Sequence, residues 1–416
     1  MNIRTLLHSK IAGQTGFLLI ATISNIITQI VINAALARSI SQEDYGNYSY
    51  FINLFTFCQT IFNFGFFYTI CRIVSTTQNQ EEIRTYYYEG LKFLSLTAVI
   101  LVACLYIYSF IDLPELKRNG IEQVFWIIAP FSFVYLITNF NEQILQGNNR
   151  IRELALSRAL PKFTYALLLG ILFILHEKFS ILGYLFLYLG SHFVIYFYLI
   201  KRIGPRAGAE SKFKEIFKQN RKFGLNIYLG SLLSVGVANM MGLIISKYCP
   251  DNVQLGYYNI ALQITIPLTL IPNILSTVLF AKFAKNPSLS PKIIYTLLLI
   301  SITLYTTLYF LSDLIICLIF GDGYLPAAKL IKILGLGSLL YGMADFFNRY
   351  ILARGKASAI RNISITIGLI YLASGFILIP KQYAEGASYA KVFAGLIYFI
   401  LEVIVVRYYL RKERLY

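Results

Sequence analysis

Long apolar segments recur along the whole chain, and short polar connections separate them. Each segment is about 20 residues long, which is the length that an α-helix needs to cross about 30 Å of hydrocarbon. Strands of a membrane barrel would be about half as long and would alternate apolar with polar residues. We therefore predict an all-α integral membrane protein with twelve transmembrane helices, at residues 14–36, 48–70, 91–111, 123–145, 160–175, 181–200, 223–246, 257–283, 293–320, 330–352, 362–379 and 388–407.

The segments form two sets of six that repeat at an offset of about 210 residues. Gly46 and Tyr48, in EDYGNYSYFINLF after the first segment, match Gly256 and Tyr258 in VQLGYYNIALQIT after the seventh. The turn ILQGNNR after the fourth segment matches ILARGK after the tenth. Because six is an even number, the second set begins on the same side of the membrane as the first. The two lobes are therefore predicted to be parallel repeats.

The predicted organisation is an N-terminal six-helix lobe at 1–200, a basic cytoplasmic linker at 201–222 and a C-terminal six-helix lobe at 223–416. The later part of the linker, SKFKEIFKQNRK, places Phe213, Ile216 and Phe217 on one helical face with basic residues around the rest. This pattern is typical of an interfacial helix on an anionic leaflet. A solvated basic loop is the alternative.

Composition and charge agree with a membrane protein. Hydrophobic residues make up 57% of the chain and charged residues 14%. A net charge of +17 would indicate nucleic-acid binding in a soluble protein. Here most Lys and Arg residues lie in the N-terminal segment and in every second connection, as in cytoplasmic loops. Both termini are therefore predicted to be cytoplasmic, and topology explains the charge.

Several kinds of chemistry lack their sequence signatures. The chain has no phosphate-binding glycine loop with its Lys, no His and Glu pair at metal spacing, and no Ser-His-Asp set. Its five cysteines are scattered and indicate neither a disulfide framework nor a metal site. We expect no enzyme activity and no cofactor, so transport energy would come from a gradient, from a partner or from consumption of the product.

Amide side chains inside the apolar segments are the first candidates for a site. They are Asn25, Gln29 and Asn33 in the first segment, Gln59 and Asn63 in the second, and Asn259 and Gln263 in the eighth. Residues four apart share one face of a helix. Amides suit sugar hydroxyls, so we expect these faces to line a substrate cavity, although membrane amides also hold helices together.

Charged residues within the segments are the second candidates. Glu142 lies in the fourth segment, and either it or Asp345 in the tenth is expected to couple transport to H+ or Na+. Asp345 and Arg349 are four residues apart and are expected to pair on one face. Three lysines near predicted outer helix ends would either attract a diphosphate or reach towards the membrane surface. They are Lys329, Lys332 and Lys391.

The connecting motifs identify a family. EDYG and its copy LGYY, the turns QGNNR and ARGK, and the FGDGY stretch before the tenth segment resemble the Wzx-type polysaccharide flippases. These are O-antigen translocases of the multidrug/oligosaccharidyl-lipid/polysaccharide exporter superfamily. The resemblance covers essentially the whole chain. Its motifs are turn and packing motifs, so they specify the fold better than the substrate.

The resemblance implies a function and its partners. It implies a multi-pass protein of the bacterial inner membrane that moves undecaprenyl-pyrophosphate-linked oligosaccharide, for lipopolysaccharide, to the periplasmic leaflet by alternating access. A polysaccharide polymerase and a chain-length regulator would be partners. The amide faces would hold the glycan, and Arg38, Arg72, Arg349 or the outer lysines would contact the diphosphate.

Other readings remain open. A cation-coupled multidrug exporter of the same superfamily would share the fold, but that branch typically has an acidic residue in the first span, and 14–36 has none. The lipid II flippase branch usually adds two further spans. A membrane polysaccharide polymerase or ligase would be an enzyme with a sizeable periplasmic loop, whereas the predicted outer loops here are short.

Overall fold

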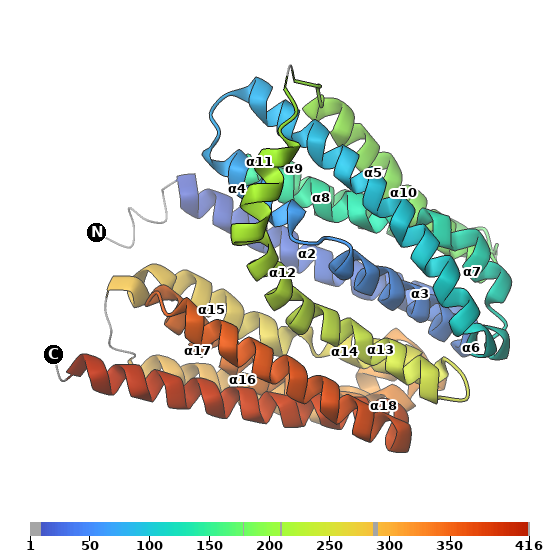
Figure 1. The fold of residues 1–416 in the computed structure, drawn as a ribbon. Helices are drawn as coiled ribbons and strands as arrows, with labels where there is room; N and C mark the ends of the chain where they lie inside the picture. Colours follow the sequence, from blue (N-terminus) through green and yellow to red (C-terminus); the bar gives the residue numbers. More distant parts are fainter. Residues whose placement is uncertain (1–9, 178, 209, 286–289, 415–416) are drawn as a thin grey trace. The chain divides into compact units, whose positions relative to one another are not determined.

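The computed structural model describes residues 10–177, 179–208, 210–285 and 290–414 (Figure 1). These residues form helices joined by short connections, and they contain no β-strand. The prediction of an all-α protein is therefore confirmed. Parts of both predicted cytoplasmic termini, residues 1–9 and 415–416, lie outside the described residues.

The chain divides into two compact units, and unit 1 comprises Met1–Ser41 and Phe55–Ser231. Its helices are α2 (Lys10–Ser39), the second part of α3 (Gln42–Ile61), α4 (Phe66–Thr76), α5 (Gln80–Ile111), α6 (Leu113–Arg118), α7 (Glu122–Ile128), α8 (Phe133–Gly147), α9 (Ile151–Ile174), α10 (Ile181–Ile203), α11 (Phe213–Gln219) and α12 (Leu225–Ser231). A 3₁₀ turn, η1 (Ala129–Ser132), joins α7 to α8, and a π-helical turn, η2 (Asn220–Gly224), joins α11 to α12.

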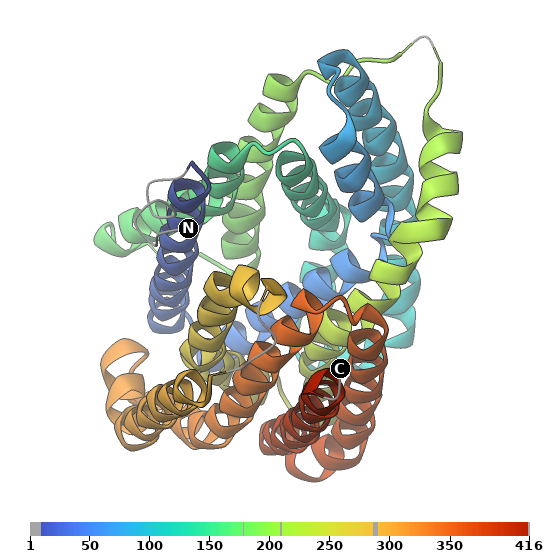
Figure 2. The same ribbon diagram turned by 90° about the vertical axis from the view of Figure 1, so that its left-hand side faces the viewer.

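Unit 2 comprises Gln42–Leu54 and Leu232–Tyr416. After the first part of α3 it contains the π-helical turn η3 (Leu232–Gly236), α13 (Val237–Tyr248), α14 (Val253–Ile264), α15 (Ile266–Lys285), α16 (Pro291–Ile319), the 3₁₀ turn η4 (Asp322–Tyr324), α17 (Pro326–Ala353) and α18 (Ala357–Arg414). α15, α16 and α18 all pack against α17 (Figure 2). α18 is two helices joined at a kink, where Tyr383 has φ 49° and ψ −124°.

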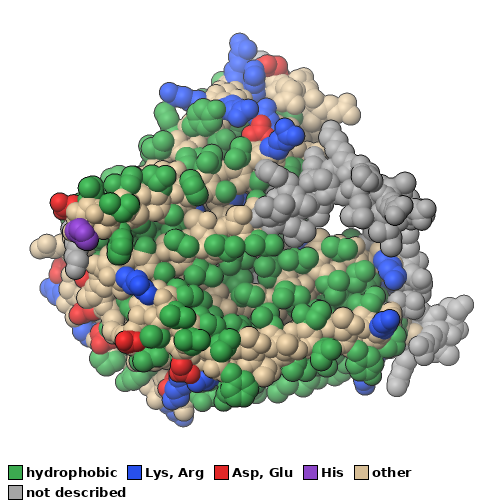
Figure 3. Space-filling view, turned by 180° about the vertical axis from the view of Figure 1, so that it is seen from behind, with side chains coloured by type: hydrophobic (Ala, Val, Ile, Leu, Met, Phe, Trp, Pro, Cys, Tyr) green, Lys and Arg blue, Asp and Glu red, His purple; other side chains and the backbone are tan. Residues whose placement is uncertain are grey.

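Length and hydropathy mark eight helices of the described chain as able to cross a membrane, or nine if α3 and α4, bent by 60° at their junction, form one span. α18 counts once among them, although its kink lies between two predicted spans. Apolar side chains cover much of the visible surface (Figure 3), and some, such as Ile174 and Phe310, are about three-quarters exposed. Such a surface suits contact with lipid. The count of twelve spans stays a prediction.

In unit 2 the family motifs pack against one another. A Cβ atom on Gly46 would fall on the backbone carbonyl oxygen of Asn252, so only glycine fits there. Tyr324, from FGDGY, makes edge-on ring contacts with Tyr45 at 5.6 Å and with Tyr257 at 6.0 Å. The motifs thus build a packed cluster from three separate parts of the chain.

In unit 1 the end of the predicted linker fills the break between α3 and α4. The break contains Phe64 and Gly65, both with positive φ. The side chain of Asn220 donates to the carbonyl oxygen of Phe64 at 3.0 Å and accepts from the hydroxyl of Thr69 at 2.9 Å. Gly224 lies against Gly65 with no room for a Cβ atom on either residue. The hydrogen bonds of Asn220 and the close contact of the two glycines therefore hold the chain in the broken conformation.

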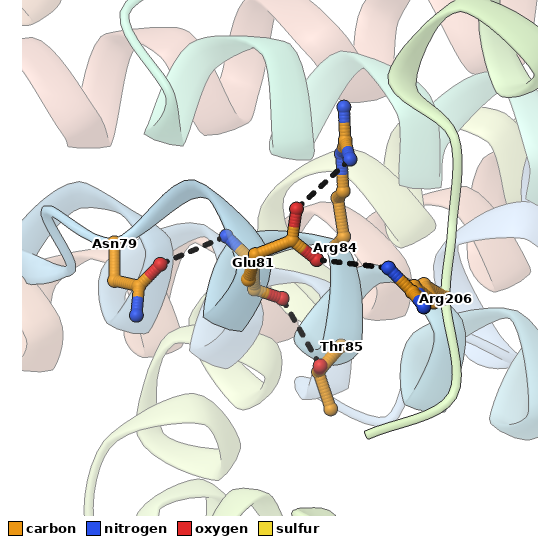
Figure 4. A network of polar contacts seen from close by, with 5 residues as sticks. All are labelled: Asn79, Glu81, Arg84, Thr85 and Arg206. Atoms are coloured by element: carbon orange, nitrogen blue, oxygen red, sulfur yellow. Dashed lines mark hydrogen bonds and ion pairs between the residues drawn. The ribbon is translucent and has the colours of Figure 1, made fainter.

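The start of the linker is also attached to unit 1 (Figure 4). Asn79 caps α5 by accepting from the backbone N–H of Glu81 at 3.0 Å. Arg206 of the linker lies 3.8 Å from the carboxylate of Glu81, which also pairs with Arg84 at 3.0 Å. Between these attachments α11 forms over part of the predicted interfacial segment, and its contact with a leaflet stays a prediction.

Candidate substrate cavities

Unit 1 contains a cavity of about 360 Å³ that is lined by residues of α2, α3, α8, α9 and α10. Predicted residues on its wall are Asn25, Gln59 and Glu142. Its other polar lining residues include Tyr135, Asn139, Arg158, Lys162, Tyr188, His192 and Tyr196. The structure therefore brings one amide from each of the first two predicted spans to the same cavity as the candidate acid of the fourth.

The charges on this wall are unbalanced towards the positive. Arg158 donates to the carboxylate of Glu142 at 2.8 Å, which pairs these two groups. Lys162 lies one helical turn further along α9. Among the described residues it has no hydrogen bond and no carboxylate within 4.0 Å. The carboxylate of Glu142 attracts it electrostatically but is already paired with Arg158, which leaves the donors of Lys162 free and makes it a candidate contact for an anionic ligand.

Two amides of the cavity present free acceptors. The side-chain oxygens of Asn25 and Asn139 are buried and accept no hydrogen bond from any described residue. Buried polar atoms usually have partners, so such orphans indicate bound water or ligand. Gln59 is used differently, because it donates to the backbone carbonyl of Tyr135 at 2.9 Å.

Unit 2 contains a second cavity of about 450 Å³, between η3, α13, α14, α15, α17 and α18. Four tyrosines line it: Tyr258, Tyr341, Tyr371 and Tyr398. Their hydroxyls and rings form a continuous arc, since the hydroxyls of Tyr258 and Tyr371 are 3.2 Å apart and the ring of Tyr341 lies 5.5 Å from that of Tyr398. Asp345 and Lys391 lie on the same wall.

Asp345 does not form the pair expected from spacing alone. Its two carboxylate oxygens accept from the hydroxyl of Tyr398 at 3.0 Å and from the side-chain amide of Asn273 at 3.3 Å. Arg349 is exposed and has no carboxylate within 4.0 Å among the described residues. The two residues therefore form no ion pair within 4.0 Å, although Arg349 still acts electrostatically on Asp345, which lines the cavity.

Apart from Lys391, the remaining predicted residues lie outside both cavity walls. Gln29 and Asn33 share a face of α2, as their spacing predicts, and bond to each other at 3.2 Å. Asn63 and Gln263 are buried, Asn259 is half-buried, and Arg38 and Arg72 are exposed. Lys329 and Lys332 pair with Glu385 and Asp313 at 2.6 and 2.8 Å, whereas Lys391 lines the unit 2 cavity.

Arg158, Lys162, Asn273 and the tyrosine arc were not among the residues predicted from the sequence. A signal for the first two was present, because Arg158 and Lys162 are four residues apart at the start of the fifth predicted span. The predicted fifth span begins at residue 160 and therefore excludes Arg158, whereas α9 begins at Ile151 and includes it. The tyrosines carry no such signal, since the chain contains 32 of them.

Comparisons with known proteins agree with this architecture. Among solved structures, a lipid II flippase MurJ in an inward closed conformation aligns with a TM-score of 0.76 at 17% identity, over 94% of this chain and 87% of that one. A multidrug resistance MATE family transporter of the MOP superfamily aligns with 0.73 at 12% identity in its inward-facing conformation, over 93% and 95%. An outward-facing MATE structure gives 0.59 at 13%, over 98% and 97%. At these identities the likeness shows the fold.

No curated protein matches the sequence significantly. The sequence model of one family, described as polysaccharide biosynthesis protein, matches residues 11–287. That match spans well over half of the chain and confirms the family resemblance of the connecting motifs. The solved relatives are named as transporters and flippases rather than enzymes. The chain is thus a multi-pass membrane protein, and it belongs to the family of polysaccharide biosynthesis proteins.

Proposed function

We propose that this protein is a flippase for undecaprenyl-pyrophosphate-linked oligosaccharide, the O-antigen repeat unit, in the bacterial inner membrane. It moves its cargo from the cytoplasmic to the periplasmic leaflet by alternating access. The observation that carries this proposal is the unit 1 cavity, which is lined by Lys162 and Arg158 and by the unsatisfied amide oxygens of Asn25 and Asn139.

The cavity supplies what such a cargo lacks in a bilayer. A sugar diphosphate loses the hydration of its charges and hydroxyls when it enters hydrocarbon, at a cost of many kcal/mol. Basic side chains replace water around the diphosphate, and amide and tyrosine groups replace it around the sugars. The lipid tail stays in the membrane, so only the head group needs a polar site.

Energy and topology complete the proposal. The protein has twelve spans with both termini in the cytoplasm, and a proton or sodium gradient drives it through Glu142 or Asp345. Glu142 is placed to act because its carboxylate pairs with Arg158 at 2.8 Å, and an arriving diphosphate would compete for that guanidinium. A polysaccharide polymerase and a chain-length regulator take the product on the periplasmic side.

The test is to delete the gene in its host and assay which leaflet holds the undecaprenyl-linked repeat unit. We expect surface glycan to be lost and the lipid-linked unit to be trapped on the cytoplasmic side. Complementation with the wild-type chain should restore both, and mass spectrometry of the trapped unit identifies the cargo. A unit that reaches the periplasmic side but stays unpolymerised would contradict the proposal.

A cation-coupled multidrug exporter is the second candidate. The observation that favours it is Asp345 on a wall shared with four tyrosines, a combination that suits an organic cation. Expression in a drug-sensitive host distinguishes the two functions. An exporter raises resistance to cationic drugs and loses this effect in Asp345→Asn, whereas a flippase leaves drug sensitivity unchanged.

A further inference from the structure

Lys391 is the unexplained group of the unit 2 cavity. It lies on α18, is half-buried and makes one hydrogen bond, from its ammonium to the hydroxyl oxygen of Ser338 at 2.9 Å. That hydroxyl in turn donates to the hydroxyl of Thr265 at 3.2 Å. Ser338 therefore accepts one hydrogen bond from Lys391 and supplies no negative charge. An ammonium has three donors, and no carboxylate of the described chain lies within 4.0 Å of this one.

The acidic residue on the same wall, Asp345, does not form an ion pair with Lys391. Both oxygens of Asp345 accept hydrogen bonds, from Tyr398 and Asn273. Leaving a buried cation without an opposite charge is destabilising, and protein interiors usually avoid it. Lys391 therefore has no ion-pair partner within 4.0 Å among the described residues and keeps donors that an entering anionic group could use.

The surroundings of Lys391 are shaped to keep it in place. A Cβ atom on Gly337 would lie 3.2 Å from Cγ of Lys391, so glycine leaves room for the lysine stem where α17 and α18 pack. A Cβ atom on Gly395 would meet the ring of Tyr341 at 3.0 Å. The same close contact between the two helices thus positions the cation and one ring of the tyrosine arc.

The remaining wall suits a sugar ring. Aromatic faces bind the apolar face of a pyranose, and a few fixed polar groups orient its hydroxyls. Here the arc of four tyrosines supplies the faces, and Asn273 and Asn239 supply amides. A bare diphosphate would use the cation but not the rings, and an organic cation would use Asp345 and the rings but not Lys391.

We propose that the unit 2 cavity binds an acidic sugar of the cargo, with a uronic-acid carboxylate on Lys391 and its pyranose ring on the tyrosine arc. This inference rests on the proposed flippase function for its biological meaning. The binding chemistry itself follows from the cavity alone and is tested without transport.

The test measures binding to the purified full chain in nanodiscs of neutral lipid, by saturation-transfer NMR. The probes are two oligosaccharides that differ only in the terminal residue, glucuronate in one and glucose in the other. We expect the glucuronate probe to bind about tenfold more tightly, as for one charge-assisted contact in a partly buried site. Lys391→Met should remove this preference, and Lys391→Arg should keep it. The control Lys292→Met, at an exposed lysine of α16, should also keep it.

Three results would overturn the proposal. Equal affinity of the two probes for the wild type removes the acidic-sugar site without any variant having to fold. A preference that survives in Lys391→Met assigns the anion to another residue. The third result concerns inorganic pyrophosphate. If it displaces the glucuronate probe from the wild type and binds equally well to Tyr341→Leu, the cavity is a phosphate site in which the tyrosine rings have no part. The leaflet assay is separate: binding without translocation refutes the flippase, and translocation without the preference refutes only this site.

Discussion

Gly256 packs directly against Gly46, its counterpart in the other half of the sequence: a Cβ atom on Gly256 would lie 3.3 Å from the Cα atom of Gly46. The two glycines occupy equivalent places in the repeated loop motif, and both belong to unit 2. The internal repeat thus matters for packing within one unit as well as for symmetry. Neighbouring side chains add polar contacts, since Asn252 donates to Asn47 at 2.8 Å.

This contact predicts that two glycine-to-alanine substitutions change the stability of the protein by different amounts. In Gly46→Ala the new methyl group meets the backbone carbonyl of Asn252, which cannot rotate away. We expect a loss of roughly 2–4 kcal/mol, as for overpacking with backbone displacement. The control is Gly170→Ala in α9, where nothing lies within 4 Å, so helix propensity should leave stability unchanged or raise it. Thermal unfolding in detergent measures the stability of both variants. Equal melting temperatures would show that the backbone around Asn252 can move to accommodate the methyl group.

A second prediction separates binding from stability in the unit 1 cavity. Lys162 has no hydrogen bond to any described residue, so Lys162→Met should leave the melting temperature unchanged or raise it, and should lower glycan export by about tenfold. Arg158→Met should lower both, because it leaves the carboxylate of Glu142 without its partner. The control is Arg152→Met at an exposed position of the same helix. Normal export by Lys162→Met would remove this lysine from the substrate site.

These residues show where sequence reasoning reaches its limit. The shared face of Gln29 and Asn33 was predictable, because positions four apart on one helix are neighbours whatever surrounds them. The partner of Asp345 was not predictable in this way. Spacing suggested Arg349, but the carboxylate bonds to Tyr398, 53 residues away on another helix. Which helices adjoin, and which of their faces meet, depends on packing among all the helices of a unit.

A third prediction concerns the break between α3 and α4. Asn220→Ala removes both hydrogen bonds that its side chain makes across the break, to Phe64 and from Thr69. We expect a loss of about 1–3 kcal/mol, because buried partners are left unsatisfied. Amide hydrogen exchange should rise selectively around 61–69. The matched control is Asn226→Ala, whose exposed side chain donates to the backbone carbonyl of Lys222, one turn earlier in η2. Unchanged exchange in Asn220→Ala would mean that backbone packing alone holds the break.

The last prediction concerns Glu402, which is fully buried on α18. One carboxylate oxygen accepts from the side chain of Asn348 at 2.8 Å, and the other accepts from no described residue. A buried carboxylate with a single donor is costly in its charged form. Glu402→Gln keeps an oxygen that can accept from Asn348 and removes the charge, so we expect unfolding stability to stay equal or to rise by about 1 kcal/mol. Asn348→Ala should instead lower it by about 1–3 kcal/mol, because the acid then has no donor. Thermal unfolding at neutral pH distinguishes these outcomes. A clear loss of stability in Glu402→Gln would show that the negative charge itself is required, and would direct the search for its counter-charge to the helices that pack on α18.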